Sequence, residues 1–515
     1  MAAARIIVIG AGVGGLTAAL ALAARGHAVT VCERAADVGG KLRTIRVAGH
    51  DTPIDAGPTV FTMRWVFDEI FGEAGLAFED VVRLEPAALL ARHAWRADEH
   101  LDLYADIDQS ADAIAAFAGP AEARGYRNFC DTARSAYESL RSTFIAAPKP
   151  SVTGLVSRLG VSGLAKFSRA SPFSTLAREL ERHFRDARLR QLFGRYATYV
   201  GSSPYAAPAT LALIAHVEQA GVWFADGGMH ALARALAAAG IDRGVEIRTN
   251  TRVAEILTSG GRASGVRLDD DEQIDADAVV FNGDAAALPL GHLGAGARTA
   301  ASSEVGTRSL SAVTFAMAAR TSGFPLVRHS VFFSNDYAAE FNDLFALQRM
   351  PQDPTVYVCA QDRTGANGAV PADGERLLCL INAPANGDDA RWAAPEEIER
   401  CRERMIRRLT ACGLALQSEP RSEVATTPRD FAALFPGRGG ALYGPASHGW
   451  MASFQRPAAR TRLSGLYLAG GSVHPGAGVP MAALSGRMAA HSLLEDLAST
   501  RTWVRAGTPG GTSTG

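Results

Sequence analysis

Apolar and polar positions near the N-terminus follow two different periods. Residues 5–9 form a short, almost wholly apolar run, residues 14–25 form a stretch rich in Ala and Leu, and residues 28–32 are rich in β-branched side chains. A short apolar run between turn residues is typical of a buried strand, and a longer amphipathic or Ala-rich stretch is typical of a helix. The first 32 residues therefore predict a βαβ unit.

Strands and helices alternate again in the second half of the chain. A strand over 465–469 leads through a glycine turn into a helix over 482–497, and a further helix covers 230–239. Alternating runs at 245–249, 253–258 and 263–268 predict a meander that returns to the first sheet, as does the strand over 279–281. Short apolar runs around 332–333, 356–359 and 377–381 predict a second sheet.

These elements predict an α/β protein with a Rossmann-like domain and a discontinuous substrate domain. We expect the nucleotide-binding domain to comprise residues 1–105, 222–292 and 455–498. The insertions 106–221 and 293–454 would supply the substrate domain, and the Gly, Thr and Ser content of 499–515 predicts a disordered tail.

A glycine motif lies between the first strand and the first helix. Gly10-Ala11-Gly12-Val13-Gly14-Gly15 has the G-x-G-x-x-G spacing in which a pyrophosphate approaches the backbone and a helix N-terminus. Glu33 ends the second strand, where its carboxylate can accept hydrogen bonds from ribose hydroxyls and would disfavour the 2′-phosphate of NADP. We predict a dinucleotide site here.

Two further glycine loops favour FAD over NAD, because a tightly held flavin is contacted from several sides. The first region holds Gly39-Gly40-Lys41-Leu42-Arg43 and Asp55-Ala56-Gly57-Pro58-Thr59, and the second is 470–481. In the latter, a helix N-terminus could stabilise negative charge on a reduced flavin. The expected cofactor contacts are Gly10, Gly12, Val13, Gly14, Gly15, Glu33, Arg34, Lys41, Leu42, Arg43, Gly57, Pro58, Thr59, Val253, Asn282, Gly471, Gly478, Val479, Pro480 and Met481.

Charge and cysteine content exclude several classes of protein. With 52 basic and 53 acidic residues, a net charge of -1 offers no general attraction for nucleic acid. The six cysteines form no CxxC pair and have no histidine in ligand spacing, so we expect a reducing compartment and no metal site. Glycines interrupt the N-terminal apolar stretch, which argues against a signal peptide, and we expect no membrane-spanning helix.

One segment departs from the even charge balance. Residues 149–195 contain ten cationic and three acidic residues, interleaved with apolar side chains such as Leu155 and Phe173. This pattern is typical of a surface that lies on an anionic membrane, and equally of a solvated pair of Arg-rich helices.

In the order of its motifs, nearly the whole chain resembles the bacterial carotenoid desaturases, phytoene-desaturase-like flavoproteins of the amine-oxidase-like superfamily. Besides the N-terminal glycines, the resemblance rests on residues 55–59, 199–204, 221–229, 329–334, 354–359 and 474–478. Where that family usually continues with Ile-Pro-Gly, this chain has Val479-Pro480-Met481. The variant is similar to the branch that acts on 1-hydroxylated carotenoids, which puts phytoene in doubt as the substrate.

The resemblance implies an FAD-dependent enzyme that forms a C=C bond, namely the 3,4-bond of a 1-hydroxy- or 1-methoxy-neurosporene. Hydride would leave for flavin N5 with loss of a proton, and the electron acceptor would be oxygen or a quinone. Since a polyene of about forty carbons is held in lipid at about 0.8 kcal/mol per CH₂, the implied location is the cytoplasmic face of the inner membrane, with residues 149–195 against the lipid.

Several alternatives stay open at this point. His474 could act as a base or simply pack, and we assign no catalytic residue. The chain could be a phytoene desaturase, or another amine-oxidase-like flavin oxidase. It could also be a lipid-binding protein without flavin, similar to the GDP-dissociation inhibitors.

Overall fold

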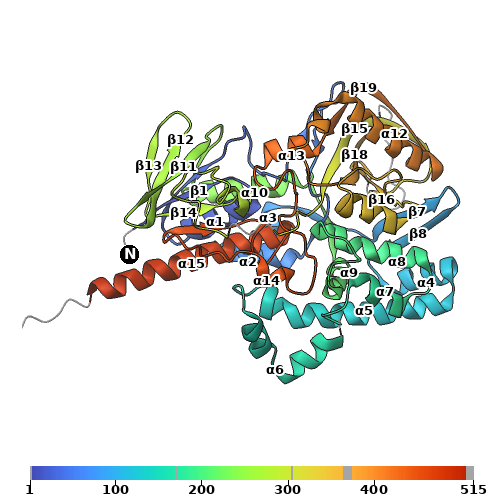
Figure 1. Ribbon diagram of the computed structural model, residues 1–515, viewed down its shortest axis with the longest axis horizontal. Helices are drawn as coiled ribbons and strands as arrows, with labels where there is room; N and C mark the ends of the chain where they lie inside the picture. The colour runs from blue at the N-terminus through green and yellow to red at the C-terminus, as the bar shows by residue number, and fades with distance from the viewer. Residues whose placement is uncertain (1–2, 170, 303–305, 364–373, 506–515) are drawn as a thin grey trace, which may run out of the picture.

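The computed structural model describes residues 3–169, 171–302, 306–363 and 374–505. A parallel sheet with its helices lies at one end of the molecule and a larger, mostly antiparallel sheet at the other, with a layer of helices along one side (Figure 1). These features agree with the predicted α/β class and with a discontinuous second domain.

The parallel sheet is built from strands that are far apart in the chain. Its order is β10 (Glu246–Arg248), β2 (Ala28–Cys32), β1 (Arg5–Ile9), β14 (Ala278–Phe281) and β20 (Leu466–Leu468). All neighbouring pairs are parallel, so the carboxyl ends of the strands meet at one edge, where α/β proteins bind ligands. Helices α1 (Val13–Ala23), α10 (His230–Asp242) and α15 (Val479–Arg505) cover one face.

The meander does not extend this sheet, contrary to the prediction. Strands β11 (Val253–Ser259), β12 (Arg262–Leu268) and β13 (Gln273–Asp275) form a separate antiparallel sheet, and only β10 and β14 return to the parallel one. Ile256 and Val266 of the meander pack with Ile7 and Phe281. The meander therefore covers the second face of the parallel sheet, a role that alternation alone does not distinguish from pairing at its edge.

The second sheet has seven strands in the order β19-β15-β18-β17-β16-β7-β8. Strands β15 (Ser311–Gly323), β16 (His329–Phe332), β17 (Val356–Ala360), β18 (Glu375–Ala383) and β19 (Leu414–Thr426) come from the predicted substrate domain. Strands β7 (Leu89–Arg96) and β8 (Glu99–Tyr104) join them through the β7–β16 pair, although we placed residues 1–105 in the nucleotide domain. Residues 89–104 therefore belong to the second sheet and not to the parallel one.

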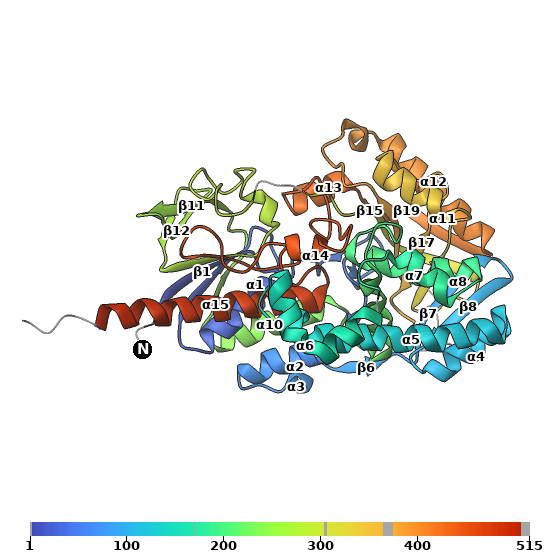
Figure 2. The same cartoon turned by 60° about the horizontal axis from the view of Figure 1, so that its bottom comes forward.

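A layer of helices connects the two sheets. It contains α4 (Ile107–Ala118), α5 (Pro120–Leu140), α6 (Val152–Arg169), α7 (Leu176–His183), α8 (Ala187–Gly194) and α9 (Leu213–Gln219). Figure 2 shows the long α5 helix running along this side, with α6 at the end nearer to α15. No described helix is long and apolar enough to cross a membrane.

The C-terminal helix is longer than the sequence predicted. Helix α15 continues to Arg505, so residues 499–505 are helical where we expected a disordered tail. The remainder of that predicted tail, residues 506–515, lies outside the described residues.

Candidate dinucleotide and substrate site

The first glycine loop joins β1 to α1 at the carboxyl edge of the parallel sheet. A Cβ atom at Gly15 would lie 2.1 Å from the carbonyl oxygen of Gly10, and one at Gly12 would lie 2.9 Å from Nδ2 of Asn282. Only glycine therefore lets the helix begin this close to the strand. The first amides of α1 point out of this turn with the positive end of the helix dipole, which suits a pyrophosphate.

Glu33 is fixed beside this loop. One carboxylate oxygen accepts from the Ala11 amide at 2.7 Å and the other accepts from the Ala35 amide at 2.8 Å. The carboxylate is buried but retains lone pairs for a second set of donors, so it fits the predicted ribose contact. The Arg34 side chain is instead hydrogen-bonded to the carbonyls of Ala433 and Leu434.

The second loop packs directly on the first. Gly39 donates its amide to the Ala11 carbonyl at 2.8 Å, and Ala56 donates to the Arg43 carbonyl at 2.8 Å. A Cβ atom at Gly57 would lie only 1.8 Å from the carbonyl oxygen of Lys41. Residues 39–43 and 55–59 are therefore in contact, and Gly57 is required for that contact.

The two cations of this loop have different partners. Lys41 donates to the carbonyl of Leu442 and lies 5.4 Å from the ring centroid of Phe435. Arg43 donates to Thr426 Oγ1 at 3.0 Å, and its guanidinium lies over the ring of Phe431. Leu42 between them is buried. Both cations therefore tie the loop to segments 426–442 of the second domain, and neither is a free surface charge.

Lys41 belongs to a partly buried group of charges that the motifs did not reveal. Burial lowers the pKa of its ammonium, and the Asp284 carboxylate opposes that shift. Arg438 and Arg456 are also buried, and burial, together with Arg438, lowers the pKa of Arg456 to about 10. Nε of Arg438 lies 3.5 Å from Asp284 Oδ1, but among the described residues neither its Nε nor its Nη1 has a hydrogen-bond partner. Three cations around Asp284 fit an anionic group such as a dinucleotide phosphate.

The third loop, 470–481, closes against the first. Asn282 at the end of β14 donates Nδ2 to the Gly10 carbonyl at 3.2 Å, and a Cβ atom at Gly470 would lie 3.0 Å from its Oδ1. Gly471 accepts from Arg456 at 2.9 Å. Gly478 has a φ of 119° and precedes α15, whose first residues are Val479, Pro480 and Met481. The first turn of α15 thus begins beside the other two loops.

The predicted cofactor contact Val253 and the candidate base His474 differ from the loop residues in their surroundings. Val253 packs beneath the sheet with Ile9 and Cys32 and pairs with Leu268 in the meander. His474 places Nε2 2.9 Å from the Ala147 carbonyl oxygen, and its ring packs on Phe144 at 4.8 Å. Burial lowers the pKa of His474 to about 4, which keeps the ring neutral. These are the contacts of a packing residue, so the base role receives no support.

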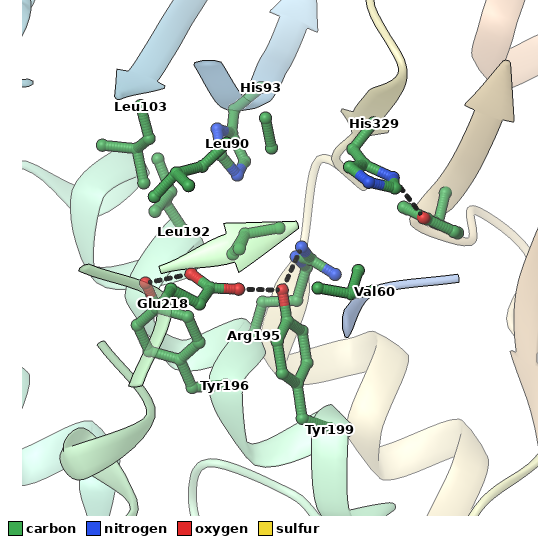
Figure 3. A pocket seen from close by; sticks show the side chains of 13 residues that line it. Val60, Leu90, His93, Leu103, Leu192, Arg195, Tyr196, Tyr199, Glu218 and His329 are labelled. Carbon is green, nitrogen blue, oxygen red and sulfur yellow. Dashed lines mark hydrogen bonds between the residues drawn. The ribbon is translucent and has the colours of Figure 1, made fainter. Parts of the chain in front are cut away.

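A small cavity starts where the 55–59 loop ends. Thr59 Oγ1 lies 2.6 Å from the hydroxyl of Tyr357, and Val60 lines the cavity (Figure 3). The cavity volume is about 20 Å³. Its apolar lining consists of Val60, Leu90, Ala91, Leu103, Leu192 and Val222, and its polar lining of His93, Arg195, Tyr196, Tyr199, Glu218, His329 and Tyr357.

The chain is similar to a known protein family, to curated proteins and to solved structures. The family described as flavin containing amine oxidoreductase matches residues 13–494. The chain is 53% identical to the hydroxyneurosporene desaturase of Rubrivivax gelatinosus, over 99% of this chain and 97% of that protein. It is 47% identical to the hydroxyneurosporene desaturase of Cereibacter sphaeroides, over 96% and 98%. The crystal structure of an oxidoreductase from Methanosarcina mazei matches with a TM-score of 0.59 at 18% identity, over 95% and 100% of the two chains.

Proposed function

The chain belongs to the flavin containing amine oxidoreductase family, and from its relatives that match over nearly the full length we propose that it desaturates a carotenoid. FAD is its cofactor, as predicted, and the protein is an oxidoreductase. The proposed reaction forms the 3,4-double bond of a 1-hydroxy- or 1-methoxy-neurosporene-type substrate. Two relatives that match nearly end to end are named hydroxyneurosporene desaturase, which supports this substrate class.

The reaction removes two hydrogens from adjacent saturated carbons. A bound flavin supplies the acceptor for one of them as hydride, and the other leaves as a proton while the C=C bond forms. The side chains contribute mainly by position. Lys41, Arg438 and Arg456 would hold anionic groups of the cofactor, and Glu33 would hold its ribose. Oxygen or a quinone would take the electrons afterwards.

The observation that carries this proposal is the contact between the glycine loops and the cavity. The three glycine loops meet at one edge of the parallel sheet. The second loop, residues 39–43 and 55–59, ends at Thr59 beside Tyr357 of the second sheet. A dinucleotide held by these loops would have its reactive end near the apolar lining. The family match favours this enzyme over the flavin-free lipid binder considered above.

An anaerobic half-reaction tests the proposal. The purified holoprotein is mixed with a 1-hydroxylated carotenoid in liposomes, and absorbance is recorded for both the flavin and the pigment. We expect the flavin to bleach in step with a red shift of the pigment, at a ratio of one flavin per new double bond. Phytoene serves as the comparison substrate. A flavin that stays oxidised in the presence of every carotenoid tested would refute the proposal.

We also propose that the region around α6 rests on an anionic lipid surface. Val161 is 89% exposed and Phe173 is 77% exposed, and Phe173 packs on the exposed Trp450 at 5.3 Å between ring centroids. Large apolar side chains this exposed favour burial in a partner phase. Arg158 and Arg178 are exposed in the same segment and could reach lipid phosphates. The protein would then take its substrate from the cytoplasmic face of the inner membrane.

Fewer of the ten cations are available at this surface than the sequence count suggests. Arg195, counted among the ten cations, lines the internal cavity. Arg188 is paired with Asp186 and Glu99. The side chains of Lys166 and Arg169 lie outside the described part of the structure. The exposed apolar residues therefore support the lipid contact more directly than the net charge does.

Liposome sedimentation tests this surface. Phe173→Ser combined with Val161→Ser should lower the bound fraction on phosphatidylglycerol vesicles severalfold, because two apolar side chains can no longer enter the lipid. Ile241→Ser is the matched control, since Ile241 is 56% exposed on α10. Equal sedimentation of the double variant and wild type would place the lipid contact elsewhere.

A further inference from the structure

The polar end of the cavity is a buried hydrogen-bonded cluster. Glu218 accepts from the hydroxyls of Tyr196 and Tyr199, each at 2.8 Å. Arg195 donates to the Tyr199 hydroxyl at 2.8 Å, so that residue links the cation to the carboxylate (Figure 3). Tyr196 and Glu218 are buried, whereas Arg195 and Tyr199 keep accessible surface. A cation and a carboxylate are thus held inside the protein at the polar wall of the cavity, opposite its apolar lining.

Two histidines on the same wall have nitrogen atoms without partners. Nδ1 of His329 lies 2.7 Å from the Tyr357 hydroxyl, but its Nε2 has no hydrogen-bond partner among the described residues. Nδ1 of His93 is likewise unpartnered within the described structure. Both rings are almost fully buried, and both line the cavity. Buried polar atoms are normally paired, so two unpartnered nitrogens on residues that line one cavity indicate a missing polar ligand. Nδ1 of His474 is also unpartnered among the described residues, but His474 does not line this cavity.

Both rings are neutral in the folded protein. Burial lowers the pKa of His329 to about 3, with Arg328 and Arg195 adding to the shift. Burial and Arg195 lower the pKa of His93 to about 3. A neutral imidazole offers either a donor or an acceptor at the free nitrogen, depending on the tautomer. A ligand group that can both donate and accept a hydrogen bond pairs with the free nitrogen in either tautomer.

The cluster also lies close enough to the cofactor loops to contact an oxygen that is a few bonds from the reacting carbons. The Tyr357 hydroxyl lies 2.6 Å from Oγ1 of Thr59, at the end of the second glycine loop, and 2.7 Å from Nδ1 of His329. In the proposed substrate, the oxygen is on C1 and the new bond joins C3 and C4. At about 1.5 Å per C–C bond, C1 lies no more than about 4 Å from C4. A receptor for that oxygen must therefore adjoin the cofactor loops.

We propose that His329 and His93, backed by the Arg195, Tyr199 and Glu218 cluster, bind the tertiary hydroxyl of the substrate and select hydroxylated carotenoids. This inference rests on the proposed function and makes it more specific. A hydroxyl both donates and accepts, whereas a methoxy oxygen only accepts and a hydrocarbon end does neither. We therefore expect the enzyme to prefer a substrate with a hydroxyl over one with a methoxy group, and a methoxy substrate over a hydrocarbon. The cavity, at about 20 Å³, suits a group of this size rather than the polyene itself.

The test measures specificity rather than rate alone. For wild type, kcat/KM is compared between a 1-hydroxylated carotenoid and the same carbon chain without oxygen, both in liposomes. We expect roughly a 100-fold preference for the hydroxylated pigment, since a site built to bond a hydroxyl rejects an analogue that lacks it. His329→Leu should reduce this preference about tenfold or more, and His329→Gln should retain part of it through its amide. Tyr126→Phe is the control, because it removes a buried hydroxyl outside the cavity lining.

Each outcome decides one of the two proposals. An unchanged preference in a His329→Leu protein that keeps its flavin overturns the hydroxyl site, while desaturation by wild type still supports the enzyme. If His329→Leu loses flavin, His93→Leu is measured in its place with the same expectation. If wild type desaturates neither pigment, the proposed function fails. The site is then judged by binding alone, and equal retention of both pigments after gel filtration overturns it.

Discussion

Acid should destabilise this protein through three buried histidines. The folded-state pKa is about 3 for His93, about 3 for His329 and about 4 for His474, in each case because burial disfavours the charged ring. In the unfolded chain a histidine titrates near 6.5. Between these values the unfolded state binds more protons than the folded state, so the free energy of unfolding falls as the pH falls below about 6.5. Above that pH the contribution is fully present.

The magnitude follows from the difference between the two states. Each proton taken up only on unfolding costs about 1.4 kcal/mol per pH unit, so each histidine lowers the free energy of unfolding by about 2 kcal/mol between pH 6.5 and pH 5. Any folded pKa below about 4.5 gives nearly the same value. Glu340 acts in the opposite direction, because burial raises its pKa to about 7. Its protonation in the folded state raises the free energy of unfolding by about 2 kcal/mol between pH 6.5 and pH 5. From these four groups we expect a net loss of about 4 kcal/mol, a large fraction of the stability of a typical domain.

The assay is urea unfolding of the holoprotein at pH 5, 6, 7 and 8, followed by tryptophan fluorescence. The His93→Gln variant takes up one proton fewer than wild type on unfolding. Below pH 6.5 the slope of its free energy of unfolding against pH should therefore be smaller than that of wild type by about 1.4 kcal/mol per pH unit. His292→Gln is the matched control at an exposed histidine, and its curve should run parallel to that of wild type. Parallel curves for His93→Gln and wild type would show that His93 already carries its proton in the folded state, which refutes the reasoning.

Three other predictions concern the cofactor loops. Lys41→Ala should weaken flavin retention on dialysis about tenfold or more, because a half-buried cation is lost beside the anionic ligand, and unchanged affinity would refute the assignment. Glu33→Gln should weaken FAD binding about tenfold, since the amide must set an NH₂ group against the Ala11 or Ala35 amide, and the FAD dissociation constant measured by fluorescence checks this. Gly57→Ala should lower the melting temperature by several degrees and release flavin, because its Cβ would lie 1.8 Å from the Lys41 carbonyl oxygen. Gly72→Ala, where a Cβ meets nothing within 4 Å, should do neither.

Local patterns in the sequence predicted the nucleotide-binding half well. The strands over 5–9 and 28–32 have the predicted bounds, and the helix between them begins at Val13, one residue before the predicted start. Each of these elements is determined by its own residues: glycines that no other residue can replace, and apolar runs buried on both faces of a sheet. The same holds for Gly470 and the start of α15, where a strand, a turn and a helix repeat the pattern.

Features that depend on distant contacts were not predictable in this way. Strand β7 contains an apolar run that could have joined either sheet, and its pairing with β16 depends on residues more than 200 positions away. Arg438 and Arg456 lie in irregular segments without a motif, and they became candidates only when the fold placed them beside Lys41 and Asp284. A weaker signal did exist: Arg438 stands between glycines in Gly437-Arg438-Gly439-Gly440, a composition typical of a tight loop.

Arg195 shows most directly why a sum of charges cannot assign a surface. In the sequence it ends a basic stretch, and counting it with the others favoured a lipid contact. In the fold it lies one turn before Tyr199, and their side chains bond each other and face Glu218 from α9. An arginine that ends a basic stretch and is followed by aromatic residues at positions 196 and 199 is compatible with a hydrogen-bonded position inside the protein as well as with a solvated helix. The interior role removes one cation from the membrane argument and adds a charged wall to the cavity. The two proposals therefore separate experimentally: Arg195→Met should change carotenoid specificity without changing the fraction of protein that sediments with anionic vesicles.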